Sequence, residues 1–229
     1  KKIGEGTYGQ GHVIQNEQHT NIALKTSYFD SSSKFTSEND IFNLISMKRE
    51  LVALKHLNHP CIVSLYFHEY RENLDFFSLH LGLELMSTNL YQTIECNTFT
   101  LSTISYIVWQ LCHGLSFIHS HGIVHRDFTS SNILIDNQCN IKIADFGFAR
   151  RIPFSYENVE NFNLTMDVCT AFFRAPELFY ESKTMYSFGV DVWSLGCIIM
   201  NILDKGSFMF QSSCEHLNVE GLNANVWAK

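Results

Sequence analysis

The chain carries His125-Arg126-Asp127-Phe128-Thr129-Ser130-Ser131-Asn132, then Ile133-Leu134-Ile135, and then Asp145-Phe146-Gly147. Asp127 and Asn132 lie in one polar loop, and Asp145 follows a short predicted hairpin. This order brings three oxygen-bearing side chains around one point. Mg²⁺ prefers such hard ligands and binds jointly to carboxylates and substrate phosphates. A polar loop with incidental acids is the alternative, and the length of the whole string disfavours it.

A glycine-rich run opens the chain as Ile3-Gly4-Glu5-Gly6-Thr7-Tyr8-Gly9. Glycines let backbone N–H groups approach phosphate oxygens, but the same pattern opens dinucleotide-binding folds or marks a tight turn. A dinucleotide-binding fold needs a helix directly after the glycines. Here His12-Val13-Ile14 and residues 21–26 are instead typical of a β-hairpin. The run is therefore predicted to be a loop between strands.

Lys25 closes the strand-like triplet Ala23-Leu24-Lys25, and Glu50 lies on the next predicted helix. A strand lysine is commonly a solvated edge charge. Paired with a buried carboxylate, it becomes a fixed cation that can hold anionic oxygens. The sequence alone leaves both interpretations open.

Two lobes are predicted from the hydrophobic periodicity. Residues 1–85 combine β-type runs with one amphipathic helix over 41–57, which indicates a small α+β lobe. Residues 86–229 are mainly helical, with an apolar stripe along 101–120 and an almost wholly apolar segment at 190–203. The predicted fold class is α+β and bilobal.

Composition excludes several partners. Lys+Arg 16 against Asp+Glu 23 gives a net charge of −7, so we expect no nucleic-acid partner and no polybasic membrane contact. The most apolar stretch, 193–203, is too short to span a bilayer, and no signal segment opens the chain. The seven cysteines form no CxxC pair, so we expect a reducing compartment, cytoplasmic or nuclear.

The order of these motifs, continued by Ala175-Pro176-Glu177 and by Asp191-Val192-Trp193-Ser194-Leu195-Gly196, resembles the eukaryotic protein kinase family. The resemblance covers nearly the whole chain. Within the family, Lys48-Arg49-Glu50-Leu51 and residues 173–178 are most similar to the cyclin-dependent and mitogen-activated group.

The resemblance implies ATP and Mg²⁺ as ligands, with roles carried over position by position. Gly4, Gly6 and Gly9 would cover the phosphates, Lys25 would hold them, and Glu50 would orient Lys25. Asp127 would orient or deprotonate the substrate hydroxyl, while Asn132 and Asp145 would hold magnesium. The residues expected around the adenine are Ile3, Ala23 and Leu134 above and below the ring, Leu83 behind it, and the backbone of Glu84 and Met86 along its edge.

Regulation is also implied by the resemblance. Thr165 stands at the position of an activating phosphothreonine, which Arg126 would pair with, and Thr7 and Tyr8 match inhibitory phosphorylation positions. Arg174 resembles an arginine associated with proline after the phosphorylated residue, which favours a Ser/Thr-Pro protein substrate. The need for a regulatory protein subunit stays open.

Three departures from the family pattern support a rival interpretation. Thr129 replaces a lysine that contacts the transferred phosphate, and Gly11 replaces a valine that closes over the adenine. The family's C-terminal lobe also continues beyond the apolar helix ending near Leu203, so we expect that lobe to be incomplete. The leading prediction is a protein serine/threonine kinase, and the alternative is a pseudokinase that acts as an ATP-binding or scaffold module.

Overall fold

The computed structural model describes residues 2–6, 9–15, 21–30, 38–72, 76–152, 171–179 and 187–210. Three positions predicted to be phosphorylated, Thr7, Tyr8 and Thr165, lie outside the described residues.

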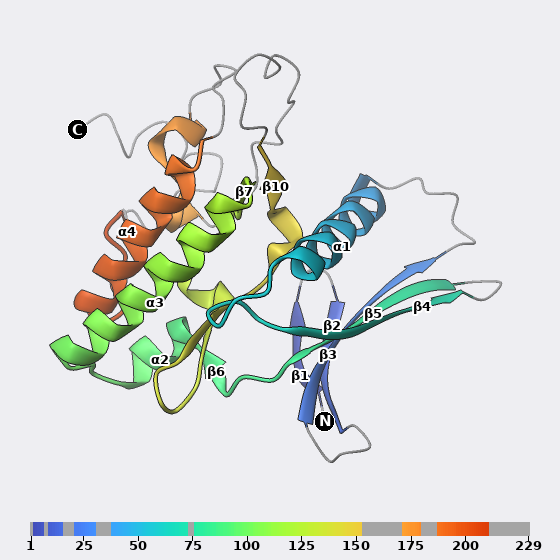
Figure 1. Cartoon of the computed structure of the whole chain (residues 1–229), viewed down its shortest axis with the longest axis horizontal. Coiled ribbons are helices and arrows are strands. Elements are labelled where there is room, and N and C mark those ends of the chain that lie inside the picture. The colour runs from blue at the N-terminus through green and yellow to red at the C-terminus, as the bar shows by residue number, and fades with distance from the viewer. Residues whose placement is uncertain are drawn as a thin grey trace, which may run out of the picture.

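A five-stranded antiparallel sheet forms the N-terminal lobe, in the order β1-β2-β3-β5-β4 (Figure 1). Its strands are β1 (Lys2–Gly6), β2 (Gly9–Gln15), β3 (Asn21–Asp30), β4 (Leu65–Glu72) and β5 (Phe76–Glu84). The glycine run therefore spans the β1–β2 connection, with Gly6 paired to Gly9 in the register. The hairpin predicted from residues 12–14 and 21–26 is the antiparallel pair β2–β3, and the described glycines of the run lie at the facing ends of β1 and β2.

Helix α1 (Glu38–His56) lies beside the sheet, where a helix over 41–57 was predicted. Met47 and Leu51 of α1 form a buried cluster with Leu79 and Leu81 of β5. Burial of these apolar side chains is the main contribution that fixes the helix on the sheet. The position of Glu50, on the same helix, follows from that packing.

The second lobe is built on α2 (Leu90–Cys96), α3 (Leu101–Ser120) and α4 (Gly189–Leu203). Asn89 and Thr100 cap α2 and α3, because their side-chain oxygens accept from Gln92 N and Thr103 N. Figure 1 shows α3 and α4 side by side. Much of the main core lies here, and Ile107, Leu111 and Ile198 in it are fully buried.

Short strands and 3₁₀ turns lie between the longer elements of the second lobe, and several of them carry or adjoin predicted site residues. The strands are β6 (Thr88–Asn89), β7 (Ile123–Val124), β8 (Ile133–Ile135), β9 (Ile141–Ile143) and β10 (Arg150–Arg151). The turns are η1 (Ser130–Asn132), η2 (Phe146–Phe148), η4 (Ala171–Phe173) and η5 (Pro176–Phe179). The boundary predicted at 85/86 falls between β5 and β6, and the predicted bilobal α+β class is confirmed.

Helix α3 is, among the described helices, the one long and apolar enough by length and composition to cross a membrane. Its apolar residues have another explanation, because Ile107, Leu111 and Ile118 are fully buried against the core. The apolar stripe along 101–120 in the sequence is therefore the face of α3 that packs into the core.

Two helical glycines give opposite predictions for Gly→Ala substitution. A Cβ at Gly114 of α3 would lie 2.6 Å from Ile143 Cδ1 and 3.1 Å from Cys61 Cβ. Because such overpacking strains a core, Gly114→Ala should lower the free energy of unfolding by about 1–2 kcal/mol. A Cβ at Gly196 of α4 would meet nothing within 4 Å. Gly196→Ala should therefore raise that free energy by up to about 1 kcal/mol, since alanine is the better helix former.

Urea denaturation measures both free energies of unfolding. Equal effects of the same sign at Gly114 and Gly196 would contradict the packing described.

Candidate active site

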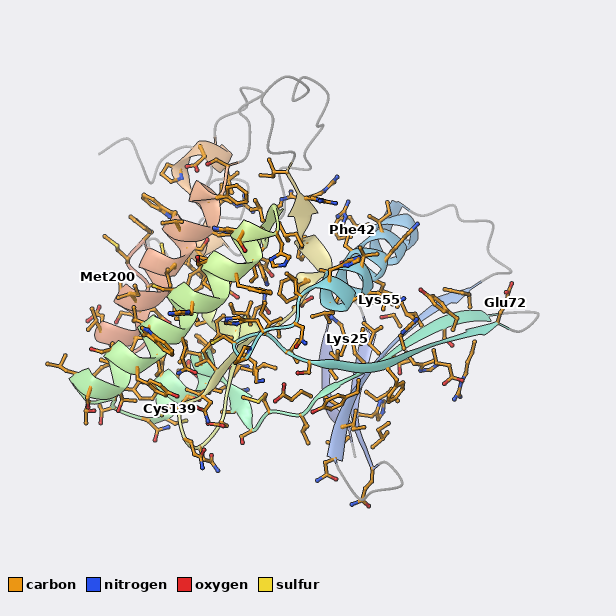
Figure 2. The ribbon with its side chains drawn as sticks, viewed as in Figure 1. Lys25, Phe42, Lys55, Glu72, Cys139 and Met200 are labelled. Atoms are coloured by element: carbon orange, nitrogen blue, oxygen red, sulfur yellow. The ribbon has the colours of Figure 1, made fainter. Side chains whose placement is uncertain are left out.

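Lys25 joins two carboxylates from different parts of the chain. Its Nζ donates to Glu50 Oε2 at 2.7 Å and to Asp145 Oδ1 at 3.3 Å. Lys25 belongs to β3, Glu50 to α1, and Asp145 directly precedes η2. Figure 2 labels Lys25 close to α1. The sheet, the helix and the second lobe therefore meet at one ammonium group.

The three groups shift one another's protonation. Burial alone would lower the pKa of Lys25, but the carboxylates of Glu50 and Asp145 outweigh it and raise that pKa above its ordinary value. Burial raises the pKa of Glu50 against the opposing effect of Lys25. Burial also acts to raise the pKa of Asp145, but Lys25 and His125 reverse the sign and lower it. Lys25 is thus a fixed cation, and Asp145 stays ionised in the neutral range.

Asn132 is bonded to Asp127 and to the backbone of the residue that precedes Asp145. Its Nδ2 donates to Asp127 Oδ2 at 2.8 Å and to the Asp127 carbonyl at 2.9 Å, while Ala144 N donates to the Asn132 carbonyl at 2.9 Å. The structure therefore brings Asp127 and Asn132 together and bonds the Asn132 carbonyl to the residue directly before Asp145. In those bonds the side-chain oxygen of Asn132 is not used.

The donor set fits magnesium bound jointly with phosphates. In the described part of the chain, no group of three His, Cys, Asp or Glu side chains forms a ready metal site. One carboxylate from Asp145 and one amide oxygen from Asn132 are hard ligands, and Mg²⁺ commonly takes one or two protein carboxylates with substrate phosphates completing its shell. A site of this kind is therefore completed by its phosphate ligand.

Asp191 of α4 holds the backbone of the loop over 125–132, the predicted catalytic loop. Its side chain is 1% exposed, and it accepts from His125 N at 2.8 Å, Arg126 N at 2.9 Å and His119 Nε2 at 2.8 Å. Arg126 and Asp145 both adopt the left-handed region, with φ of 69° and 61°. Such strain persists only where surrounding bonds fix it, and it is concentrated at functional sites.

Helix α1 is also packed against η2. A Cβ on Gly147 would collide with Ser46 Oγ of α1, so glycine permits the close approach of the two elements. The rings of Phe42 and Phe148 lie 5.8 Å apart across the same contact. On the other side of η2, Phe146 is fully buried with its ring 4.9 Å from that of His125. These contacts keep Glu50 within reach of Lys25.

The predicted adenine-contacting residues of the lobe junction are Ala23, Leu83, Glu84, Met86 and Leu134. Ala23 lies directly opposite Leu83 in the β3–β5 register, and Leu134 is a partly buried residue of β8. The backbone N–H of Glu84 donates to the Ser64 carbonyl at 2.9 Å. That N–H is therefore already used, and the Glu84 carbonyl is the backbone group that would meet a ligand.

The glycine run contributes backbone on the neighbouring strands. Ile3, Gly4 and Gly6 belong to β1 and Gly9 to β2. Gly11 lies opposite Gly4 on one side and Lys25 on the other. The valine of the family pattern, which Gly11 replaces, would therefore lie next to Lys25 on the neighbouring strand.

Thr129 is buried, with 2% of its surface exposed. Its carbonyl accepts from Asn132 N at 3.0 Å, which closes the 3₁₀ turn η1. Thr129 therefore contributes to the loop geometry and leaves the site without the lysine charge of the family pattern.

Sequence reasoning missed that Arg126 and Arg150 both repel Arg49, and these three residues are called the arginine cluster below. Burial, followed by repulsion from Arg150 and then Arg126, lowers the pKa of Arg49 to about 10. Arg126 Nη1 also donates to the Phe148 carbonyl at 3.4 Å. Like charges gathered in this way suit a multiply charged anion. Only Arg126 was predicted, because nothing in the spacing of the other two indicates that they converge.

Comparisons with known proteins agree with the geometry. Residues 1–226 match the protein kinase domain family. The probable CTD kinase subunit alpha homolog of Encephalitozoon cuniculi is 34% identical over 95% of this chain and 60% of its own length. Mitogen-activated protein kinases 3 and 5 of Arabidopsis thaliana are 35% and 33% identical over 89% and 90% of this chain, and 52% of their own lengths. The chain thus spans between half and two thirds of the curated relatives.

Removing the shared cation tests this charge network. Lys25→Met leaves Glu50, whose side chain is 3% exposed, without its partner at 2.7 Å. The free energy of unfolding at pH 7 should then fall by about 1–2 kcal/mol, because a buried carboxylate loses its cation. The loss should shrink as the pH falls through the raised pKa of Glu50, since the protonated carboxyl needs no cation. Urea denaturation at several pH values measures it.

The double variant Lys25→Met/Glu50→Gln supplies the control, because it removes the carboxylate together with the cation. It should recover stability at pH 7 relative to Lys25→Met. A double variant no more stable than Lys25→Met would contradict the pairing.

Proposed function

The chain belongs to the protein kinase domain family, and on that premise we propose that it is a protein serine/threonine kinase that transfers the γ-phosphate of ATP to protein hydroxyls. The CTD kinase and mitogen-activated protein kinase names among its relatives support the serine/threonine class. The observation that carries the proposal is the assembled set of Lys25, Glu50 and Asp145, together with Asp127 bonded to Asn132.

Each residue has a role that follows from its contacts. Lys25, held on Glu50, binds phosphate oxygens, because it already neutralises Asp145 and can exchange one anionic partner for another. Asp145 and Asn132 would hold Mg²⁺, which when bound neutralises charge on the phosphates. Asp127, oriented by Asn132 Nδ2, positions the substrate hydroxyl and accepts its proton. The new bond joins that hydroxyl oxygen to the γ-phosphorus, and ADP leaves.

The alternative, a pseudokinase, receives no support from the comparisons, since all three relatives carry kinase names. Thr129 is the feature that lowers the expected rate of phosphoryl transfer. Phosphoryl transfer depends on charge neutralisation near the γ-phosphate, so loss of one cation there is expected to slow turnover by roughly 10²-fold or more. Binding of the nucleotide does not require that lysine.

Activation through Thr165 is part of the proposal. A phosphothreonine carries close to two negative charges at neutral pH and forms charge-assisted bonds with arginines. Arg126 of the catalytic loop and Arg150 of β10 both repel Arg49 of α1. A phosphate held by all three would relieve their repulsion and join α1 to the catalytic loop. Thr7 and Tyr8 are proposed as inhibitory positions in the glycine run.

A regulatory protein subunit is also proposed. One relative is named as the alpha subunit of a CTD kinase, and that name implies other subunits in its own complex. Ile45 and Val52 of α1 are 41% and 49% exposed. Their helical spacing from Glu50 places both on the side of α1 away from it. A partner packing there would influence the Lys25–Glu50 pair through the same helix.

Phosphotransfer from labelled ATP tests the proposed activity. The chain should phosphorylate a Ser-Pro peptide faster than a Ser-Ala peptide, and Asp127→Asn should lower the rate by at least about 10²-fold. Thr129→Lys should raise it about tenfold or more by restoring the missing charge, whereas the uncharged, similarly long Thr129→Met should not. Equal background rates for the wild type and Asp127→Asn, with Mg-ATP still bound, would establish the pseudokinase instead.

Phosphorylation at Thr165 tests the arginine cluster. Protein phosphorylated at that one position should be about 1–3 kcal/mol more stable to urea than the unmodified chain, because new charge-assisted bonds form. Arg49→Gln and Arg150→Gln should each remove much of the gain. Arg71→Gln is the matched control, since Arg71 lies on β4 and binds Glu69 at 2.9 Å. A gain that survives both cluster substitutions would exclude this role for the arginines.

A further inference from the structure

A polar cluster surrounds the side chain of Glu84 at the end of β5. One oxygen, Glu84 Oε2, accepts from Lys142 Nζ at 2.9 Å, from Ser64 Oγ at 3.0 Å and from Ser64 N at 3.3 Å. The Glu84 N–H in turn donates to the Ser64 carbonyl at 2.9 Å. The side chains of Lys142 and Glu84 are 17% and 23% exposed. Solvent and salt therefore screen their attraction only in part.

The cluster connects three segments that meet between the lobes. Glu84 ends the sheet just before the chain crosses to the second lobe, and Ser64 directly precedes β4. Lys142 is the central residue of β9, three positions before Asp145. Residues 61–64 run beside the same strand, because Ile143 N donates to the Cys61 carbonyl at 2.8 Å and Val63 N to the Ile143 carbonyl at 3.0 Å.

Lys142 also has a defined place relative to the proposed adenine site. It lies directly opposite Leu134 in the β8–β9 register. Leu134 and the Glu84 carbonyl are the proposed contacts to one face and one edge of the adenine. The ion pair therefore connects the strand pair that carries Leu134 to the backbone that would bind the edge of the base.

We infer that Lys142 is a positioning residue for nucleotide binding, acting through Glu84 to fix the lobe-crossing backbone relative to Leu134 and Asp145. Without the ammonium group, the Glu84 carboxylate keeps only the two Ser64 donors and can turn toward solvent. The crossing segment then samples positions in which the Glu84 carbonyl and Leu134 are no longer matched to one base, and the nucleotide must restore that order when it binds. The inference rests on the proposed function, because it assumes that the nucleotide lies at this junction.

Loss of the Lys142 ammonium group should weaken nucleotide binding and leave the rate of phosphoryl transfer unchanged. The bonds that join Lys25 to Glu50 and Asn132 to Asp127 involve neither Lys142 nor Glu84, so they stay intact when Lys142 is changed. A loss of binding order alone raises KM with little change in kcat. A general loss of stability would instead lower the active fraction and reduce kcat.

Two measurements on the whole chain test the inference. In the nucleotide-free protein, Lys142→Met should speed hydrogen exchange at the Glu84 amide by about tenfold while leaving the buried α3 amides unchanged. Calorimetric titration with a non-hydrolysable ATP analogue and Mg²⁺ should show a roughly three- to tenfold weaker Kd, with kcat within about twofold of wild type. Lys142→Arg keeps the charge and should restore both values, and Lys55→Met, an exposed lysine at the end of α1, is the control.

The outcomes separate the inference from the proposed function. Unchanged exchange at Glu84 and unchanged Kd in Lys142→Met would overturn the positioning role, as would equal acceleration of exchange throughout the core. A wild-type chain that binds no Mg-nucleotide would instead overturn the proposed function. The exchange measurement uses no nucleotide, so it still decides whether Lys142 fixes the lobe-crossing backbone.

Discussion

One ammonium group, Lys25 Nζ, is shared between Glu50 at 2.7 Å and Asp145 at 3.3 Å, and the arrangement of the two lobes depends on it. A buried carboxylate without a cation is strongly unfavourable, so α1 must stay close to β3 for Glu50 to remain ionised. The contact between Gly147 and Ser46, which lies one turn before Glu50 on the same face of α1, favours the same position of the helix. Packing and charge therefore require a single placement of the helix, and that placement also creates the proposed phosphate site.

The second lobe supports that site through the loop over 125–132, whose backbone is fixed by Asp191. Asp191 is an almost fully buried carboxylate whose oxygens are satisfied by the amides of His125 and Arg126 and by the His119 ring. It thereby stabilises a left-handed Arg126 that the backbone would otherwise disfavour. The cluster of Lys142, Glu84 and Ser64 joins β9 of the second lobe to the sheet where the chain crosses between the lobes. The hydrogen bonds of Asp191 and the ion pair of Lys142 with Glu84 thus help to fix Asp127 and Asp145 in the free protein.

Much of the site could be predicted because its residues lie in local patterns. The string from His125 to Asn132 with Asp145 beyond a hairpin, and the triplet ending in Lys25, each carry their signal within a few positions. The convergence of Arg49 with Arg126 and Arg150, and the pairing of Lys142 with Glu84, could not be predicted. Each depends on strand register and helix placement across the whole fold, and a single arginine or lysine on a strand is compatible with an ordinary solvated charge. The burial of Thr129 could not be predicted either, because the neighbouring residues in the sequence are polar and typical of an exposed loop.

We propose that Lys25 keeps its bond to Glu50 when the nucleotide binds and exchanges Asp145 for phosphate. A crystal structure of the chain with Mg²⁺ and a non-hydrolysable ATP analogue tests it most directly. The account predicts Lys25 Nζ on both Glu50 and phosphate oxygens, with the metal between the phosphates and the side-chain oxygens of Asp145 and Asn132. Phosphates bound away from Lys25, or a metal that touches neither Asp145 nor Asn132, would contradict it.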